Sequence, residues 1–197
     1  HYMARRFNAP LLVSAFEDLQ AGTVELHVTS DLREEAEATL KWWLVKVDGT
    51  VVEEGQMPVT AAPGANAKVT TLDLSSHLQT YGLRDLLLWV ELESGGQTVS
   101  SNLVNFARPK HLELVDPKIS AQVTESAPGV FAVKLETQAP ALWVWLELAQ
   151  ADARYSDNFV TLLPGRPVTI EVRPQEKLTR EQVEAQLKVR SLVDTYA

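Results

Sequence analysis

The chain has 197 residues, a formal net charge of −8 and no cysteine. That length allows one large domain or two small ones of about 100 residues each. The missing cysteines exclude disulfides, thiolate zinc sites and a cysteine nucleophile. The acidic pI, about 5.0, argues against nucleic acid and anionic membranes as partners, and no apolar run reaches the roughly 18 residues that cross a bilayer.

The first half of the chain is predicted to form strands, after residues 1–7 that fit the end of a helix. Residues 24–29 alternate apolar and polar side chains, which is typical of a half-buried strand. Asp48-Gly49 separates the apolar run 40–47 from Val51-Val52, and such a pair predicts a hairpin. Ser94-Gly95-Gly96 predicts a second hairpin between residues 86–92 and 98–106.

Prolines then interrupt the pattern at Arg108-Pro109-Lys110 and Asp116-Pro117. Because proline cannot donate to a ladder, we predict a boundary near 108–115, with domains at 1–108 and 109–197. A new set of strands is expected at 119–124, 130–137, 142–149 and 168–172. The fold class is therefore all-β, two tandem immunoglobulin-like antiparallel β-sandwiches of ordinary size.

A short helix is expected near the C-terminus. Thr179 and Gln182 have the spacing of a capping box, with Thr179 as N-cap. Beyond the helix, Leu187, Val189 and Ser191 alternate with charged residues, so the chain is predicted to finish as a strand.

The search for catalytic motifs finds no GxSxG, Walker A, GxGxxG or HExxH string. The four histidines are scattered without an i,i+4 pair, which favours surface or capping roles over a metal site. Glu34-Glu35 and Glu53-Glu54 are most simply solvated turn or edge positions. We therefore predict no catalytic residue, no metal and no cofactor.

The aromatic residues near the middle of the first half are interpreted structurally. Trp42 and Trp43 are adjacent on one strand, so they face opposite sides. Trp43 shares a face with Val45 and Val47 and is the expected core residue, whereas Trp42 is expected to be partly exposed. Tyr81 stands where a tyrosine corner is expected.

Trp143 and Trp145 form the clearest candidate for a contact surface. Leu142, Val144, Leu146 and Leu148 are expected on the apolar face of their strand, and the two tryptophans on the opposite face. Tryptophans placed outward either stack on sugar rings or pack against protein, and packing against protein is favoured. Trp42 is the third candidate for such a contact.

Three sequence strings carry a family resemblance. The most distinctive of them, residues 155–159 with residues 162–165, is interpreted physically as a turn. The three strings are residues 1–14 (HYMARRFNAPLLVS), residues 109–117 (PKHLELVDP), and Tyr155-Ser156-Asp157-Asn158-Phe159 with Leu162-Leu163-Pro164-Gly165 and residues 189–196 behind it. Together they resemble the barrel exit, the last domain junction and the final domain of glycoside hydrolase family 2 β-mannosidases. Val115 departs from the pattern, which has proline there.

The resemblance implies a non-catalytic C-terminal fragment of a β-mannosidase, with residues 1–8 a remnant of the barrel exit. Such enzymes release terminal β-linked mannose with retention, which requires two carboxyls about 5 to 5.5 Å apart. In this family both belong to a (β/α)₈ barrel of 200 residues or more, so no catalytic residue is carried over.

The implied partners are the missing barrel and N-terminal domains, and mannosides. The alternative is a carbohydrate-binding module that grips mannan through Trp143, Trp145 or Trp42. The absence of cysteine fits the cytoplasm and the periplasm alike.

Overall fold

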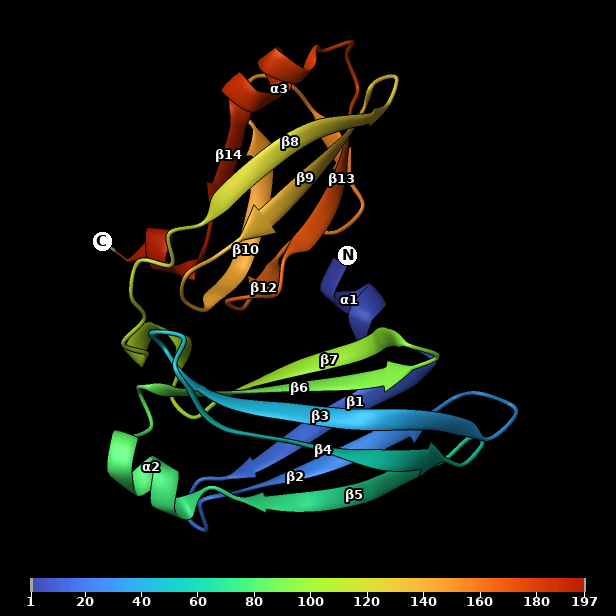
Figure 1. Cartoon of the computed structure of the whole chain (residues 1–197), viewed down its shortest axis with the longest axis vertical. Coiled ribbons are helices and arrows are strands. Elements are labelled where there is room, and N and C mark those ends of the chain that lie inside the picture. Colours follow the sequence, from blue (N-terminus) through green and yellow to red (C-terminus); the bar gives the residue numbers. More distant parts are fainter. Residues whose placement is uncertain (1, 197) are drawn as a thin grey trace. The chain divides into compact units, whose positions relative to one another are not determined.

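The computed structural model describes residues 2–196, which form two compact units that divide between Glu113 and Leu114. We call residues 3–113 domain 1 and residues 114–196 domain 2. Helix α1 (Tyr2–Phe7) comes first, as the sequence predicts, and strands dominate both domains (Figure 1). The expectation of an all-β fold is confirmed.

Domain 1 is an antiparallel sandwich of a three-stranded sheet, ordered β1-β2-β5, and a four-stranded sheet, ordered β4-β3-β6-β7. The short helix α2 links β5 to β6. The bounds are β1 Leu11–Asp18, β2 Thr23–Ser30, β3 Ala36–Lys46, β4 Val51–Ala61, β5 Asn66–Asp73, α2 Ser75–Tyr81, β6 Leu86–Ser94 and β7 Gln97–Asn105.

Both hairpins predicted for domain 1 are present. The β3–β4 turn contains Gly49 at φ 94°, and its Asp48 side chain accepts a bond from the Thr50 amide at 2.9 Å. The β6–β7 turn has Gly95 and Gly96 at φ 59° and 76°. Two successive residues with positive φ match the right-handed twist of the flanking strands, and glycine adopts that backbone without strain.

The core of domain 1 lies between its two sheets. Val24, Leu26 and Val28 of β2 are at most 3% exposed, and Leu40 and Leu44 of β3 are fully buried opposite them. Each fully buried leucine contributes about 1.5–3 kcal/mol relative to an exposed one. The alternation in residues 24–29 therefore predicted the inward face of this strand correctly.

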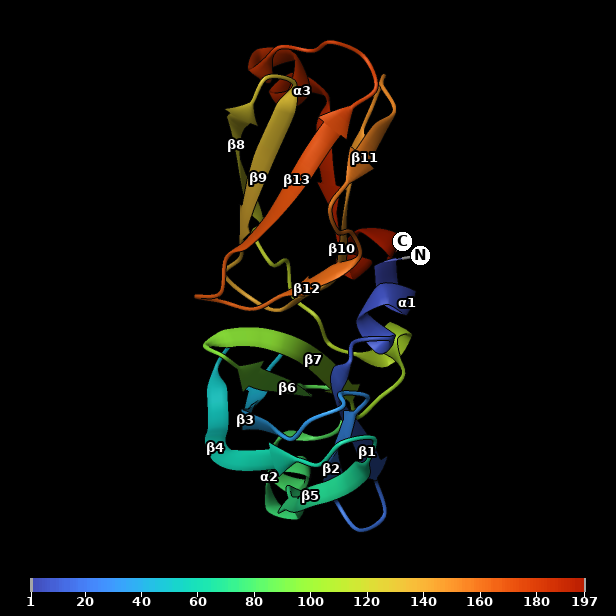
Figure 2. The ribbon, with the colours of Figure 1, turned by 90° about the vertical axis from the view of Figure 1, so that its right-hand side faces the viewer.

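Domain 2 is also a sandwich, built from a four-stranded sheet ordered β11-β13-β9-β8 (Figure 2) and a three-stranded sheet ordered β12-β10-β14. Helix α3 links β13 to β14. The bounds are η1 Pro109–His111 in the linker, β8 Ser120–Ala127, β9 Val130–Glu136, β10 Ala141–Leu148, β11 Ala153–Tyr155, β12 Val160–Leu162, β13 Val168–Pro174, α3 Arg180–Gln186, β14 Leu187–Arg190 and η2 Leu192–Thr195.

The predicted capping box of α3 is confirmed. The Gln182 amide donates to Thr179 Oγ1 at 3.3 Å, and the Thr179 amide donates to Gln182 Oε1 at 2.8 Å. Two of the amides that a helix start leaves unpaired are satisfied in this way. Val183 is then fully buried in the core of domain 2, and the predicted final strand follows as β14.

The tyrosine corner predicted at Tyr81 is wrong. Tyr81 ends α2, is 42% exposed and stacks on His77 with ring centroids 6.4 Å apart. No sequence pattern predicted this helix, which has seven residues and no side-chain cap. A single buried residue, Leu78, holds it to the core, so the periodic signal of an amphipathic helix is nearly absent.

Candidate functional site

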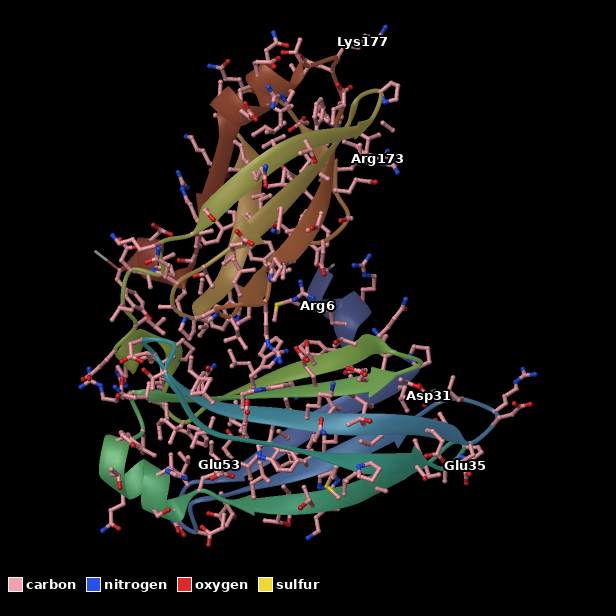
Figure 3. All side chains as sticks on the ribbon, viewed as in Figure 1. Arg6, Asp31, Glu35, Glu53, Arg173 and Lys177 are labelled. Atoms are coloured by element: carbon pink, nitrogen blue, oxygen red, sulfur yellow. The ribbon has the colours of Figure 1, made fainter. Side chains whose placement is uncertain are left out.

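Several titratable side chains of the described residues lie in contact with one another. His27 Nε2 lies 3.3 Å from Glu25 Oε2, and His77 Nε2 lies 2.9 Å from Glu53 Oε2 (Glu53 is labelled in Figure 3). Within residues 2–196, no group of three or more His, Asp or Glu side chains is placed to hold a metal ion. In the same range, no helix is long and apolar enough to cross a bilayer.

The most elaborate polar arrangement is a corner at Asn158, between β11 and β12. Asn158 is 5% exposed, and its amide group pairs with the backbone of Leu146 in β10. The Leu146 amide donates to Asn158 Oδ1 at 2.8 Å, and Asn158 Nδ2 donates to the Leu146 carbonyl at 3.0 Å. The β10–β12 register pairs Val144 with Val160, so this side chain continues the ladder where the backbone of β12 has turned away.

Tyr155 stabilises the same corner from the other end of residues 155–159. Its hydroxyl oxygen accepts a bond from the Leu148 amide at 3.1 Å, next along β10. Burial raises the pKa of the Tyr155 hydroxyl above its ordinary value, because the charged form would lose solvation. The turn predicted for residues 155–159 is therefore a structural corner that fastens a loop to β10.

A bulge in β10 sets the directions of the two tryptophans. The pairing with β12 shifts between Ala141 and Val144, and Trp143 has a positive φ of 53°. A left-handed backbone costs a non-glycine residue about 1–2 kcal/mol. The prediction that Leu142 shares the core face with Val144 is wrong, because Ala141 takes that place in the core and Leu142 is buried outside it.

Beside the bulge lies an aromatic pair. Trp145 stacks on Phe159 with ring centroids 6.1 Å apart and planes inclined by 20°. Phe159 is 43% exposed and also has a positive φ, 56°. Trp143 and Trp145 are partly buried, and neither packs against the core of domain 2. We call Trp145 and Phe159 the aromatic patch, of which the sequence analysis singled out only Trp145.

Trp42 lies elsewhere, in domain 1. It is partly buried and packs against the core from β3. Its indole ring lies over Gly55 of β4, where an added Cβ would stand 2.2 Å from Trp42 Cζ2. The indole Nε1 is buried without a hydrogen-bond partner in the structure, so Trp42 is oriented inward.

The assignment of Trp43 to the core is wrong. Trp43 is not part of the core cluster and pairs in register with Trp89 of β6. Val45 and Val47, which suggested the inward face, are buried, with exposed fractions of 4% and 2%. Neither belongs to that cluster. Apolar residues are buried on both faces at this end of β3, so alternation alone could not identify the inward face.

Family comparisons match both domains. Residues 22–111 match the family model described as a mannosidase Ig/CBM-like domain, and residues 114–195 match one described as an Ig-fold domain of mannosidases. Together these matches account for nearly all of domains 1 and 2. The chain consists of two immunoglobulin-like domains of the β-mannosidase family.

Relatives of these β-mannosidase domains span both of them. The β-mannosidase A of Aspergillus fumigatus is 29% identical over 208 residues, which cover 98% of this chain and 22% of that protein. That of Emericella nidulans is 27% identical, with the same coverage. The chain thus spans about a fifth of the length of the curated relatives that it matches.

Solved structures share the fold. A β-D-mannosidase from Dictyoglomus thermophilum matches with a TM-score of 0.81 at 20% identity, over 96% of this chain and 22% of that one. An exo-chitosanase from Amycolatopsis orientalis matches with a TM-score of 0.64 at 17% identity, over 97% of this chain and 26% of that one. The tandem sandwich arrangement therefore occurs in glycosidases whose names differ in substrate.

Proposed function

We propose that this chain is the accessory, C-terminal part of a β-mannosidase and packs against the catalytic barrel of its parent enzyme. The observation that carries the proposal is the match of both domains, in order, to relatives of about five times the length. We infer that the two domains stabilise the barrel and shape access to its substrate.

We propose that the chain by itself does not hydrolyse mannosides. The two glutamates described above contact basic side chains: Glu25 lies 3.0 Å from Lys68 Nζ and 3.3 Å from His27 Nε2, and Glu53 lies 2.9 Å from His77 Nε2. A retaining glycosidase instead needs two carboxyls flanking one sugar at about 5–5.5 Å.

The test is hydrolysis of an aryl β-mannoside by purified chain, with a full-length β-mannosidase as positive control. No turnover above buffer is expected. Turnover that co-elutes with the chain, from a host that lacks glycosidases, overturns the proposal.

The aromatic patch is the surface of domain 2 that we assign to contact with protein. Large aromatic surfaces are seldom left bare on a monomer, and Phe159 is 43% exposed. In the full-length parent enzyme, Phe159→Ala should lower the melting temperature of the enzyme without changing the KM for a mannoside. An increased KM with unchanged melting would instead favour sugar contact.

A second candidate function is the binding of mannan by domain 2, and the Trp145–Phe159 stack favours it. Calorimetry with manno-oligosaccharides tests it on the wild type and on Trp143→Ala and Trp145→Ala. Trp42 is a poor candidate, because its ring packs inward over Gly55. Absence of heat at millimolar sugar removes this candidate.

A further inference from the structure

Within residues 2–196, domain 2 repeats the strand order of domain 1 without a counterpart of the last strand of domain 1. In domain 1 the sheets are β1-β2-β5 and β4-β3-β6-β7, with α2 between β5 and β6. In domain 2 they are β8-β9-β13, extended by β11, and β12-β10-β14, with α3 between β13 and β14. By pairing and chain order, β8 corresponds to β1 and β14 to β6. Among residues 2–196, domain 2 has no counterpart of β7.

Strand β7 closes one side of domain 1. It pairs along β6 from Leu87↔Asn105 to Ser94↔Gln97. It also lies beside β1 of the other sheet, where the Val13 amide donates to Ser100 Oγ at 3.1 Å. The first and last strands of the domain therefore join the two sheets on this side.

The corresponding side of domain 2 is open. A groove of about 580 Å³ lies between residues 121–124 of β8 and the α3–β14 segment, where it is lined by Arg180, Glu184, Leu187 and Val189. Figure 1 shows β8 and β14 on the same side of the domain, next to α3. β8 and β14 are both terminal strands of their sheets, so each leaves one edge unpaired by backbone in the described chain.

The groove has an apolar floor, its charged residues Arg180 and Glu184 lie 3.7 Å apart, and the basic residues of β14 stand outside its lining. Leu187 and Val189 pack against the core of domain 2, and Val123 of β8 is 4% exposed. Lys188 and Arg190 alternate with Leu187 and Val189 along β14 and are exposed, and Arg190 lies 3.4 Å from Glu147 of β10. Cations on an edge strand disfavour pairing with an identical edge, because like charges would stand opposite one another.

We propose that this groove binds an extended polypeptide strand from a partner chain, which adds to β14 in the place that β7 occupies beside β6. The strand alternates apolar and acidic residues. Its apolar side chains cover Val123, Leu187 and Val189, and its carboxylates face Lys188 and Arg190. Main-chain hydrogen bonds supply affinity, and the alternating side chains supply specificity, as in other cases of strand addition.

The test uses the whole chain and a fluorescein-labelled peptide of alternating valine and glutamate, about eight residues long. Two matched peptides carry lysine in place of glutamate, or proline at two central positions. Fluorescence anisotropy measures binding, and amide hydrogen exchange locates it. We expect the glutamate peptide to bind best, the proline peptide not to bind, and exchange to slow in residues 187–190 while β5 is unchanged.

Charge reversal separates strand addition from unspecific attraction. Lys188→Glu should lower the affinity for the glutamate peptide about fivefold, the upper range for a cross-strand charge pair. The same change should raise the affinity for the lysine peptide. Lys177→Glu is the matched control, an exposed lysine in the loop before α3 (Figure 3) that should change neither affinity.

Three outcomes overturn the proposal. They are no binding at about 1 mM peptide, equal binding of the proline peptide, and protection of residues 187–190 by self-association of the chain. None of them bears on the proposed accessory role, which rests on different observations.

Discussion

Asn158→Ala should destabilise domain 2 far more than an average substitution. The change removes both bonds between the side chain and Leu146, at 2.8 and 3.0 Å. Leu146 is 2% exposed, so its amide and carbonyl lose partners away from water. Each buried polar group left unpaired costs about 1–3 kcal/mol, and water that enters the space of the lost amide offsets part of the total. We expect a loss of about 3 kcal/mol.

Thermal unfolding, monitored by amide hydrogen exchange, measures this loss of stability separately in each domain. In a domain of this size, 1 kcal/mol corresponds to about 4–8 °C, so domain 2 should melt at least 12 °C lower while domain 1 is unchanged. Asn66→Ala is the matched control, because Asn66 is exposed and donates one bond to Thr29 Oγ1 at 2.6 Å. A fall of less than about 3 °C for Asn158→Ala would refute the ladder-extending role of this side chain.

Three further predictions concern local structure. Gly55→Ala should cost domain 1 about 2 kcal/mol in urea unfolding by overpacking the Trp42 ring, and an unchanged midpoint would contradict the contact. The Asp48 pKa is lowered to about 2, first by its backbone bond with Thr50; the stability this adds is present above about pH 4 and lost as pH falls toward 2. Asp48→Asn should therefore flatten the decline of melting temperature in that window, and identical declines for both proteins would exclude it. Thr179→Ala should cost about 1 kcal/mol and speed amide exchange in α3, whereas unchanged exchange would show that the capping box adds nothing.

Local patterns predicted a strand well where it buries one face, as β2 does. The side chains of Val24, Leu26 and Val28 show this alternation directly, and the turn glycines mark where the hairpins reverse. The capping box of α3 needs only two residues three positions apart, so it could also be recognised from sequence.

The candidate site was less predictable, because its geometry depends on backbone irregularities. Because of the bulge at Trp143, Ala141 and not Leu142 lies in the core. A sequence pattern does not predict a positive φ at tryptophan or phenylalanine. The sequence indicated the turn at residues 155–159. Which backbone group Asn158 binds depends on the register of β10, and that is a long-range property of the fold.

The contact between β1 and β7 has a consequence for the order in which domain 1 folds. The Val13–Ser100 bond joins residues 87 positions apart in sequence, and pairing over such a distance comes with a large loss of chain entropy and slows folding. During synthesis, β1 must wait until β7 has emerged before the sandwich can close. Until then β1 lacks its contacts with β7, so the nascent domain is exposed to aggregation and to chaperones in this interval.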